Sequence, residues 1–159
     1  ILWLTGSQYG FIGQIKHGDD GAPFLQTRAI TNIAWNEATH KFYAENAPEG
    51  LKFTNLKSLF GHTIATGEPV VTNDPQNHPK SSGIPHGHPP LVSYCGLPIL
   101  FDSRMTSMLG LANRKQGYDE HLVASLQPLL STIGNLIAGF EARDMHVRIA
   151  EAFKRANEE

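Results

Sequence analysis

The residues in this chain with the clearest potential for chemistry lie between positions 74 and 95. The possible metal ligands in this stretch are Asp74, His78, His86, His88 and Cys95. Imidazole and thiolate together suit zinc or copper. However, the histidines and the cysteine are separated by 8, 2 and 7 residues, which matches no zinc motif, and two prolines stiffen the chain directly after His88. We therefore expect no metal here, and we expect polar loop histidines that shape the loop by hydrogen bonding.

Cys95 is also the one candidate thiol nucleophile. The apolar run LVSYCGLPILF (residues 91–101) places it inside a strand, where a small buried thiol is the usual outcome. A redox cycle through a disulfide needs a resolving cysteine, and the chain has one cysteine only. The sequence also lacks a Gly-x-Ser-x-Gly elbow, a Gly-rich phosphate loop and a His-Glu-x-x-His helix. It therefore predicts a domain without a catalytic centre.

The composition is that of one ordinary soluble domain. Its 159 residues are enough to bury a single core. The net charge of −2 gives no broad electrostatic preference for nucleic acid or for an anionic membrane. No stretch reaches the roughly 20 consecutive apolar residues that cross a bilayer, so we expect no membrane insertion. A single cysteine fits a reducing compartment, and we expect a cytoplasmic location.

The elements that must position these residues follow from apolar periodicity and turn chemistry. ILWLTG at the start resembles the end of a helix cut from a longer protein, stopped by Gly6. The patterns then predict strands at 9–17, 24–34, 69–73, 91–101 and 105–114, and helices at 36–46, at 56–67 with Asn55 as its cap, and from Asp119 onward. Because two of the strand pairs form hairpins, the sequence predicts an α+β domain with a central antiparallel β-sheet and flanking helices.

The segment between the two halves of this pattern is a long loop. Residues 74–90 carry five prolines in 17 positions and little that favours regular structure. Long structured loops in compact domains are usually lids or binding loops. We therefore expect this loop to wall a pocket.

This succession of elements resembles a GAF domain, a small-molecule sensor module related in fold to PAS domains. The resemblance is carried by GHTIATGEPVVTND (61–74), GHPPLVSYCGLPIL (87–100) and MLGLANRKQGYDEHLVASLQPLL (108–130). TNIAWNE (31–37) and GHPP (87–90) are most similar to the subgroup found in bacterial sensor histidine kinases and diguanylate cyclases. The resemblance implies a GAF sensor domain at 1–140 and, at 141–159, the start of a helical linker to a downstream output domain.

The resemblance also implies where a ligand sits. GAF domains hold it between the sheet and the segments covering one face, which here are residues 35–46 and 73–90. The candidate ligand-binding residues are Thr31, Asn32, Trp35, Asn73, Asp74, His88 and Tyr94. Bilin-binding relatives usually place His directly after the anchoring cysteine, whereas Gly96 follows here. We therefore expect no bilin, haem or metal, and the ligand stays unidentified.

The C-terminal helix is longer than one small sheet requires. Its apolar side chains recur at steps of 4, 3, 4, 3 and 4, through Leu122, Leu126, Leu129, Ile133, Leu136 and Phe140. A helix from Asp119 to Glu159 extends about 60 Å, and Pro128 should kink it or mark its start. Part of the apolar stripe is therefore available to a second copy, which predicts a parallel homodimer through this helix.

These patterns support three hypotheses. The first is a non-enzymatic sensory domain of a bacterial two-component or cyclic di-GMP signalling protein, which binds a small molecule and biases a dimeric helix. The second is a ligand-free dimerisation module. The third is a redox enzyme on a GAF fold, such as a free methionine sulfoxide reductase. None of the three needs nucleic acid as a partner.

Overall fold

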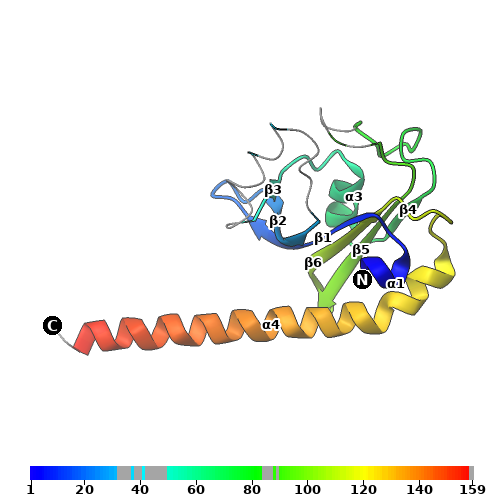
Figure 1. Ribbon diagram of the computed structural model, residues 1–159. Coiled ribbons are helices and arrows are strands. Elements are labelled where there is room, and N and C mark those ends of the chain that lie inside the picture. Colours follow the sequence, from blue (N-terminus) through cyan, green and yellow to red (C-terminus); the bar gives the residue numbers. More distant parts are fainter. Residues whose placement is uncertain (32–36, 38–40, 42–49, 84–87, 89, 158–159) are drawn as a thin grey trace.

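The computed structural model describes residues 1–31, 37, 41, 50–83, 88 and 90–157. Along the chain the elements are α1 (Leu2–Thr5), β1 (Tyr9–His17), β2 (Pro23–Ile30), β3 (Lys52–Phe53), α3 (Leu59–Thr66), β4 (Val70–Thr72), β5 (Tyr94–Phe101), β6 (Arg104–Ala112) and α4 (Glu120–Asn157). The strands form one sheet in the order β3-β2-β1-β6-β5-β4, and every neighbouring pair is antiparallel (Figure 1). The predicted fold class is confirmed. The predicted helix at 36–46 lies almost entirely outside the described residues.

Two hairpins build most of the sheet. β5 and β6 are joined by Asp102 and Ser103, whose positive φ angles of 50° and 60° suit the tight two-residue turns of hairpins. β1 and β2 carry an irregularity, because Ile12 pairs with Ala29 whereas Gly13 pairs with Thr27. One residue of β2, Arg28, is therefore extra, and the strand has a β-bulge there.

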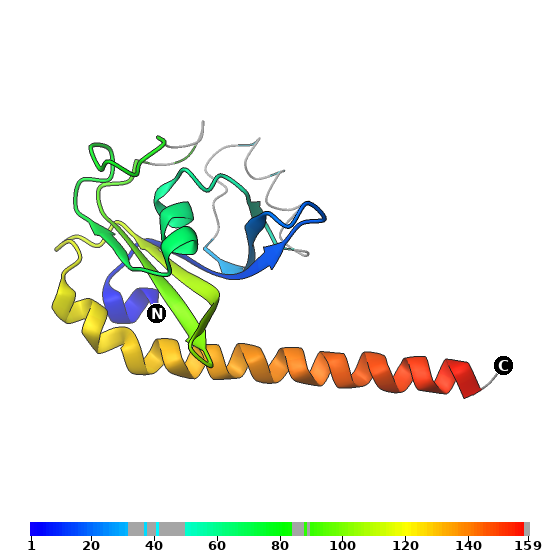
Figure 2. The ribbon, with the colours of Figure 1, turned by 180° about the vertical axis from the view of Figure 1, so that it is seen from behind.

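The sheet has two faces, with helices on either side of it (Figure 2), and successive side chains of each strand alternate between them. The face covered by α4, called the α4 face below, buries Cys95, Leu97, Ile99, Leu109, Leu111, Tyr118, Leu126 and Leu130. The face covered by α3, called the α3 face, buries Leu25, Leu59, Val70, Tyr94 and Met108, with Phe11 and Ile15 packed beside them. Both ribbon views show the two helices on opposite sides of the sheet.

Three predicted boundaries were wrong by three or four residues, and the bounds of β4 and β6 differ from the predicted ones by one or two. Helix α3 begins at Leu59, and its cap is Ser58, whose hydroxyl accepts from the Gly61 amide at 3.2 Å. Asn55 instead accepts from the Lys57 amide at 3.1 Å and so closes the turn before the helix. The predicted end at Gly67 is confirmed by its left-handed conformation.

The other two boundaries concern strands. β2 ends at Ile30 rather than at residue 34. β5 starts at Tyr94 rather than at residue 91. The residues before Tyr94 bond to the segment that follows β6, since the Val92 amide donates to the Asn113 side chain at 2.9 Å. The chain there is anchored without forming a ladder.

Helix α4 runs unbroken through Pro128. Its first turns, drawn in yellow, are inclined to the rest of the helix, as expected near an internal proline (Figure 1). Gly134 lies so close to β5 that a Cβ atom there would sit 2.4 Å from the Leu100 carbonyl oxygen. From Gly139 to Asn157 every residue of α4 is exposed, so the second half of the helix projects beyond the domain (Figure 1).

By length and composition, α4 is the one helix among the described residues that could cross a membrane, with a mean hydropathy of 1.3 in its most apolar 18-residue window. Core helices of soluble proteins share this composition. Leu126 and Leu130 are buried against the sheet, which is packing of that kind.

Candidate functional site

The α3 face contains two buried hydroxyl groups without partners. Tyr94 on β5 is 6% exposed, and Thr63 on α3 is completely buried. Within the part of the chain that the structure describes, neither hydroxyl makes a hydrogen bond. A buried polar group left unpaired costs about 1–3 kcal/mol, so each hydroxyl is a free position for a bonding partner. Such positions are where a bound molecule gains both affinity and specificity.

The strand itself makes room for the Tyr94 side chain. The next residue on the same side of β5 is Gly96, and a Cβ atom there would lie 2.7 Å from the Tyr94 hydroxyl oxygen and 2.7 Å from Cε of Met108. Glycine at this position therefore allows the phenol to lie along the sheet. Burial, with a smaller contribution from Cys95, raises the pKa of Tyr94 above its ordinary value. The phenol stays neutral and can both donate and accept.

Four predicted site residues lie at one end of the sheet. Thr72, Tyr94 and Ala112 pair across β4, β5 and β6, and Ala112 pairs in turn with Tyr9 of β1. Asn73 and Asp74 directly follow this row in β4. Thr31 is fixed at the same end, because its amide donates to the Gly10 carbonyl at 2.9 Å and its hydroxyl accepts from the Gly10 amide at 3.2 Å.

Asn73 and Asp74 are engaged in local structure. The Asn73 amide group brackets the backbone of Tyr118, accepting from its N–H at 2.8 Å and donating to its carbonyl at 3.1 Å. The Asp74 carboxylate accepts from the Asn77 side-chain amide at 2.9 and 3.1 Å and so closes a turn. These contacts hold β4, its following loop and the start of α4 in fixed relation. Both residues therefore fix the backbone around the site, and their described bonds are to the protein itself.

The remaining predicted residues are less informative. Asn32 and Trp35 lie outside the described residues. His88 is described and half-buried.

Cys95 belongs to the other face. It is fully buried in the α4 face among Leu97, Leu111 and Tyr118. Burial raises the pKa of the Cys95 thiol from 9.0 to about 12, so the reactive thiolate is disfavoured near neutral pH. The thiol therefore neither faces the Tyr94 hydroxyl nor has the properties of a redox nucleophile.

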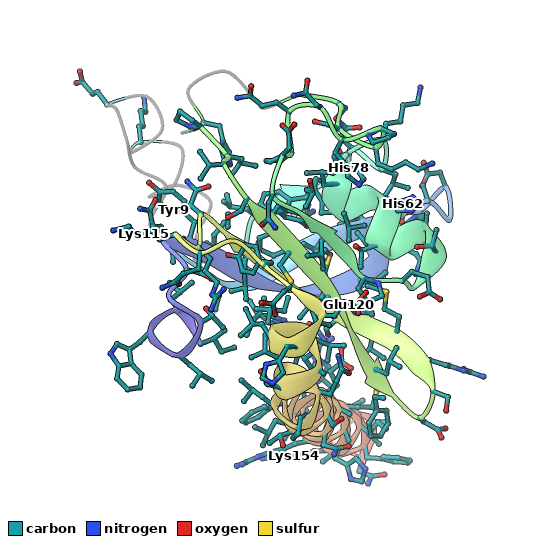
Figure 3. All side chains as sticks on the ribbon, turned by 90° about the vertical axis from the view of Figure 1, so that its right-hand side faces the viewer. Tyr9, His62, His78, Lys115, Glu120 and Lys154 are labelled. Atoms are coloured by element: carbon teal, nitrogen blue, oxygen red, sulfur yellow. The ribbon has the colours of Figure 1, made fainter. Side chains whose placement is uncertain are left out.

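The histidines of the loop and of α3 do not gather with other possible ligands in the described part of the chain, where no three His, Cys, Asp or Glu side chains lie close enough to hold a metal ion. Figure 3 shows His62 and His78 on the α3 side of the sheet, away from α4.

A polar network at the start of α4 was not predicted from the sequence. Tyr118, a residue of the α4 face, shares a hydrogen bond of 2.8 Å with the hydroxyl of Ser7, which is in turn 2.8 Å from that of Thr5. Arg114 donates to the Thr5 carbonyl at 2.9 Å. Burial raises the pKa of Tyr118 to about 12, although its bond to Ser7 opposes the shift. This network ties α1, β6 and α4 together and leaves the Tyr118 hydroxyl satisfied.

An apolar cavity of about 300 Å³ opens beside α1. Its lining is Ile1, Leu2, Gly10, Phe11, Ile12, Ala29, Ile30, Thr31, Leu109 and Leu111. Most of these side chains are hydrocarbon, and the Thr31 hydroxyl is already bonded to Gly10. The cavity thus offers little polar specificity, in contrast to the Tyr94 region.

A six-stranded antiparallel sheet with a short helix on one face and a long terminal helix on the other defines an α+β domain of the GAF type. A family model described as the GAF domain matches residues 2–138. The chain belongs to the GAF domain family.

Among curated proteins, the chain is 28% identical over 159 residues to a methyl sulfide methyltransferase-associated sensor from Methanosarcina acetivorans. The match covers 98% of this chain but only 15% of the length of that protein. Among solved structures, the GAF domain of a phosphoenolpyruvate-protein phosphotransferase from Coxiella burnetii is similar, with a TM-score of 0.69 and 17% identity over 91% of this chain and 79% of that chain.

A second solved structure carries a different activity on the same fold. It is a type II free methionine-R-sulfoxide reductase from Thermoplasma acidophilum, with a TM-score of 0.63 and 12% identity over 87% of this chain and 86% of that chain. At these identities the structural likenesses establish the fold alone.

Proposed function

We propose that this chain is a non-enzymatic sensory domain that binds a small molecule on the α3 face and passes its state to an output domain through α4. The observation that carries the proposal is the Tyr94 hydroxyl, which is buried opposite α3 and has no hydrogen-bond partner among the described residues. The alternative of a redox enzyme is disfavoured because Cys95 is buried in the opposite face and its pKa is raised to about 12.

The surroundings of Tyr94 define the chemistry of the ligand. A neutral phenol offers one donor and one acceptor, and the Thr63 hydroxyl offers the same. The neighbouring buried side chains are apolar, namely Leu59, Val70 and Met108. We therefore expect a small molecule with an apolar body and a neutral or weakly charged polar group, because a strongly charged group would be desolvated there without an opposite charge.

The sensor named in the Methanosarcina match supports a sensory role at the level of the domain. Because this chain spans 15% of that protein, the output is a separate proposal. We propose a GAF sensor domain at residues 1–140, a helical linker at 141–159 and a downstream histidine kinase or diguanylate cyclase, in a cytoplasmic signalling protein. The charged, fully exposed second half of α4 supports the linker.

The test of the site begins with a thermal-shift screen of small metabolites, followed by calorimetry on any compound that raises the melting temperature. Tyr94→Phe should weaken binding by about tenfold, because the ligand loses one hydrogen bond to a buried group. Tyr118→Phe is the matched control, since its hydroxyl already bonds to Ser7 on the other face. Equal affinity in wild type and Tyr94→Phe would exclude this site.

We also propose a parallel homodimer through α4. Leu136 is 56% exposed, Phe140 65% and Val147 49%, and their spacing places them on one flank of the helix. An apolar stripe of this kind also suits a ligand-free dimerisation module. A sensory domain and a dimerisation module would therefore both be dimers, and only the sensory domain would bind a ligand.

Light scattering of the 159-residue chain at high micromolar concentration tests the assembly. Leu136→Glu should convert a dimer to a monomer, because the interface would bury an unpaired charge. Ser131→Glu, an exposed change on another flank of the same helix, is the control. Removal of residues 141–159 should weaken the dimer without unfolding the domain. A monomeric wild type would contradict the dimer.

A further inference from the structure

One buried side chain links the sheet to the outgoing half of α4. Gln14 of β1 is 2% exposed and faces the α4 side. Its Oε1 accepts a hydrogen bond from Nε of Arg28 on β2, and its Nε2 donates to Oε1 of Glu141 on α4. A cation and an anion are therefore connected through one amide. Below, these three residues are called the relay.

Strand alternation places Arg28 on the same side of the sheet as Gln14. Thr27 pairs with Gly13, which faces away from α4, so the next residue of β2, Arg28, faces α4. Because Gln14 pairs with Gln26, Arg28 lies diagonally across from Gln14, within reach of a long side chain. The bulge leaves this unchanged and brings Ala29 to the same side, since Ile12 pairs with Ala29. The position of Arg28 in the relay thus follows from regular strand geometry.

The other end of the relay lies where α4 leaves the domain. Ile137 and Ala138 are half-buried, and each residue from Gly139 to Asn157 is exposed. Glu141 is the one residue in this exposed stretch for which a hydrogen bond to the sheet is described. Both bonds of the relay are charge-assisted, which makes them stronger than bonds between neutral groups. Loss of either charge would leave the buried Gln14 amide partly unsatisfied.

We propose that the relay is a latch that fixes the outgoing half of α4 to β2. The link from ligand to latch rests on the proposed function: β2 ends beside Thr31, at the same end of the sheet as Tyr94, where the ligand is proposed to bind. A shift of β2 would move Arg28, release or strengthen the bond between Gln14 and Glu141, and so change the equilibrium between docked and undocked α4. Such a device passes on a signal only if the two states differ in free energy by an amount a ligand can supply.

Hydrogen exchange on the protein without ligand tests the latch. Glu141→Ala should lower the protection of amides at about residues 138–146 by about tenfold, because the helix there loses its link to the sheet. Glu151→Ala is the matched control: it makes the same change on the exposed part of α4, away from the relay, and should leave those amides unchanged. Equal protection in the two variants would overturn the proposal.

A charge swap separates the relay from general effects on the helix. Arg28→Glu and Glu141→Arg, each alone, should lower the same protection. Combined, they should restore it to within about twofold of wild type, because the Gln14 amide can turn over and serve the reversed charges. With Gln14→Leu added, the restoration should be lost. A combined variant no better than the worse single change would also overturn the latch. Since no small molecule is used, failure here leaves the α3-face site standing, and failure of ligand binding leaves the latch standing.

Discussion

The two faces of the sheet use their buried polar groups differently. On the α4 face, the Tyr118 hydroxyl bonds to Ser7, and the Gln14 amide bonds on both sides. On the α3 face, the hydroxyls of Tyr94 and Thr63 have no partner among the described residues, and on the α4 face the hydroxyl of Ser107, which pairs with Gln14 and Ile99, also has none. Satisfied groups rigidify a structure, whereas unsatisfied ones cost free energy unless something binds them. The bonded groups Tyr118 and Gln14 thus support the stability of the α4 face, and the unpaired Tyr94 and Thr63 are the groups on which the proposed ligand site rests.

A single strand produces much of this difference. Along β5, Cys95, Leu97 and Ile99 point to the α4 face and are completely buried. The alternate positions Gly96 and Pro98 carry little side-chain volume toward the α3 face. The alternation of large and small residues thus fills one face with side chains of β5, and on the other it lets Tyr94 and Met108 cover the strand at Gly96.

The largest expected effect is the loss of stability caused by a cavity in the α4 face. Leu97→Ala should lower the free energy of unfolding by about 4 kcal/mol, near the upper part of the range for buried leucines. Leu59→Ala on the α3 face should cost about 2 kcal/mol, because Leu59 keeps 8% exposure at a less closed site. Urea unfolding measures both. Equal losses would mean that the two faces are packed alike.

Burial in the α4 face should also make the stability of the protein depend on pH in the alkaline range. The pKa of Cys95 is raised from 9.0 to about 12, so between these values the unfolded chain loses a proton that the folded chain keeps. The unfolded state is then favoured as pH rises, and the stability present below about pH 9 is lost up to about pH 12. Between pH 8 and 10.5, wild type should lose about 2 kcal/mol more than Cys95→Ala.

Urea midpoints of the two proteins at both pH values provide this measurement. The cavity left by the alanine is present at each pH and cancels in the comparison. Parallel pH profiles would mean that the thiol is accessible to water and that the α4 face is less closed than described.

The smallest effect concerns the hydroxyls themselves. Tyr118→Phe should cost about 1–2 kcal/mol, because it leaves the buried Ser7 hydroxyl short of a partner. Tyr94→Phe should change stability by less than about 0.5 kcal/mol or raise it slightly, since no bond is lost. Thermal unfolding without ligand compares them. A clear destabilisation by Tyr94→Phe would show that its hydroxyl already has a partner and would remove the contrast between the faces.

The strands and hairpins were predictable because their signals are local. Alternating apolar residues defined β1 within its bounds, and Gly67 marked the end of α3. The two-residue strand β3 is too short to carry a pattern. Ser58 and Asn55 are both residue types that commonly cap helices, so the sequence alone did not distinguish between them.

The candidate site was predictable in part. Tyr94 was identified through its strand and the family resemblance, and Asn73 and Asp74 lie at the same end of the sheet. Their bonding was not predictable: Asn73 binds a residue 45 positions away, and Gln14 binds one 127 positions away. Such pairs leave no periodic trace in one sequence. The bulge that brings Ala29 to the same side of the sheet as Arg28 was hidden for the same reason, because register depends on both strands.

The close contact at Gly134 sets how much of α4 extends beyond the sheet. A Cβ atom there would lie 2.4 Å from the Leu100 carbonyl oxygen, so a swing of the helix about this contact has Gly134 as its pivot. Glu141 lies seven residues beyond it, about 10 Å along the axis, and Asn157 lies about 35 Å beyond it. A sideways movement of 1 Å at Glu141 would therefore become a swing of roughly 3 Å at Asn157 if the helix stays straight. A small rearrangement in the sheet would thus reach the end of the helix enlarged about threefold.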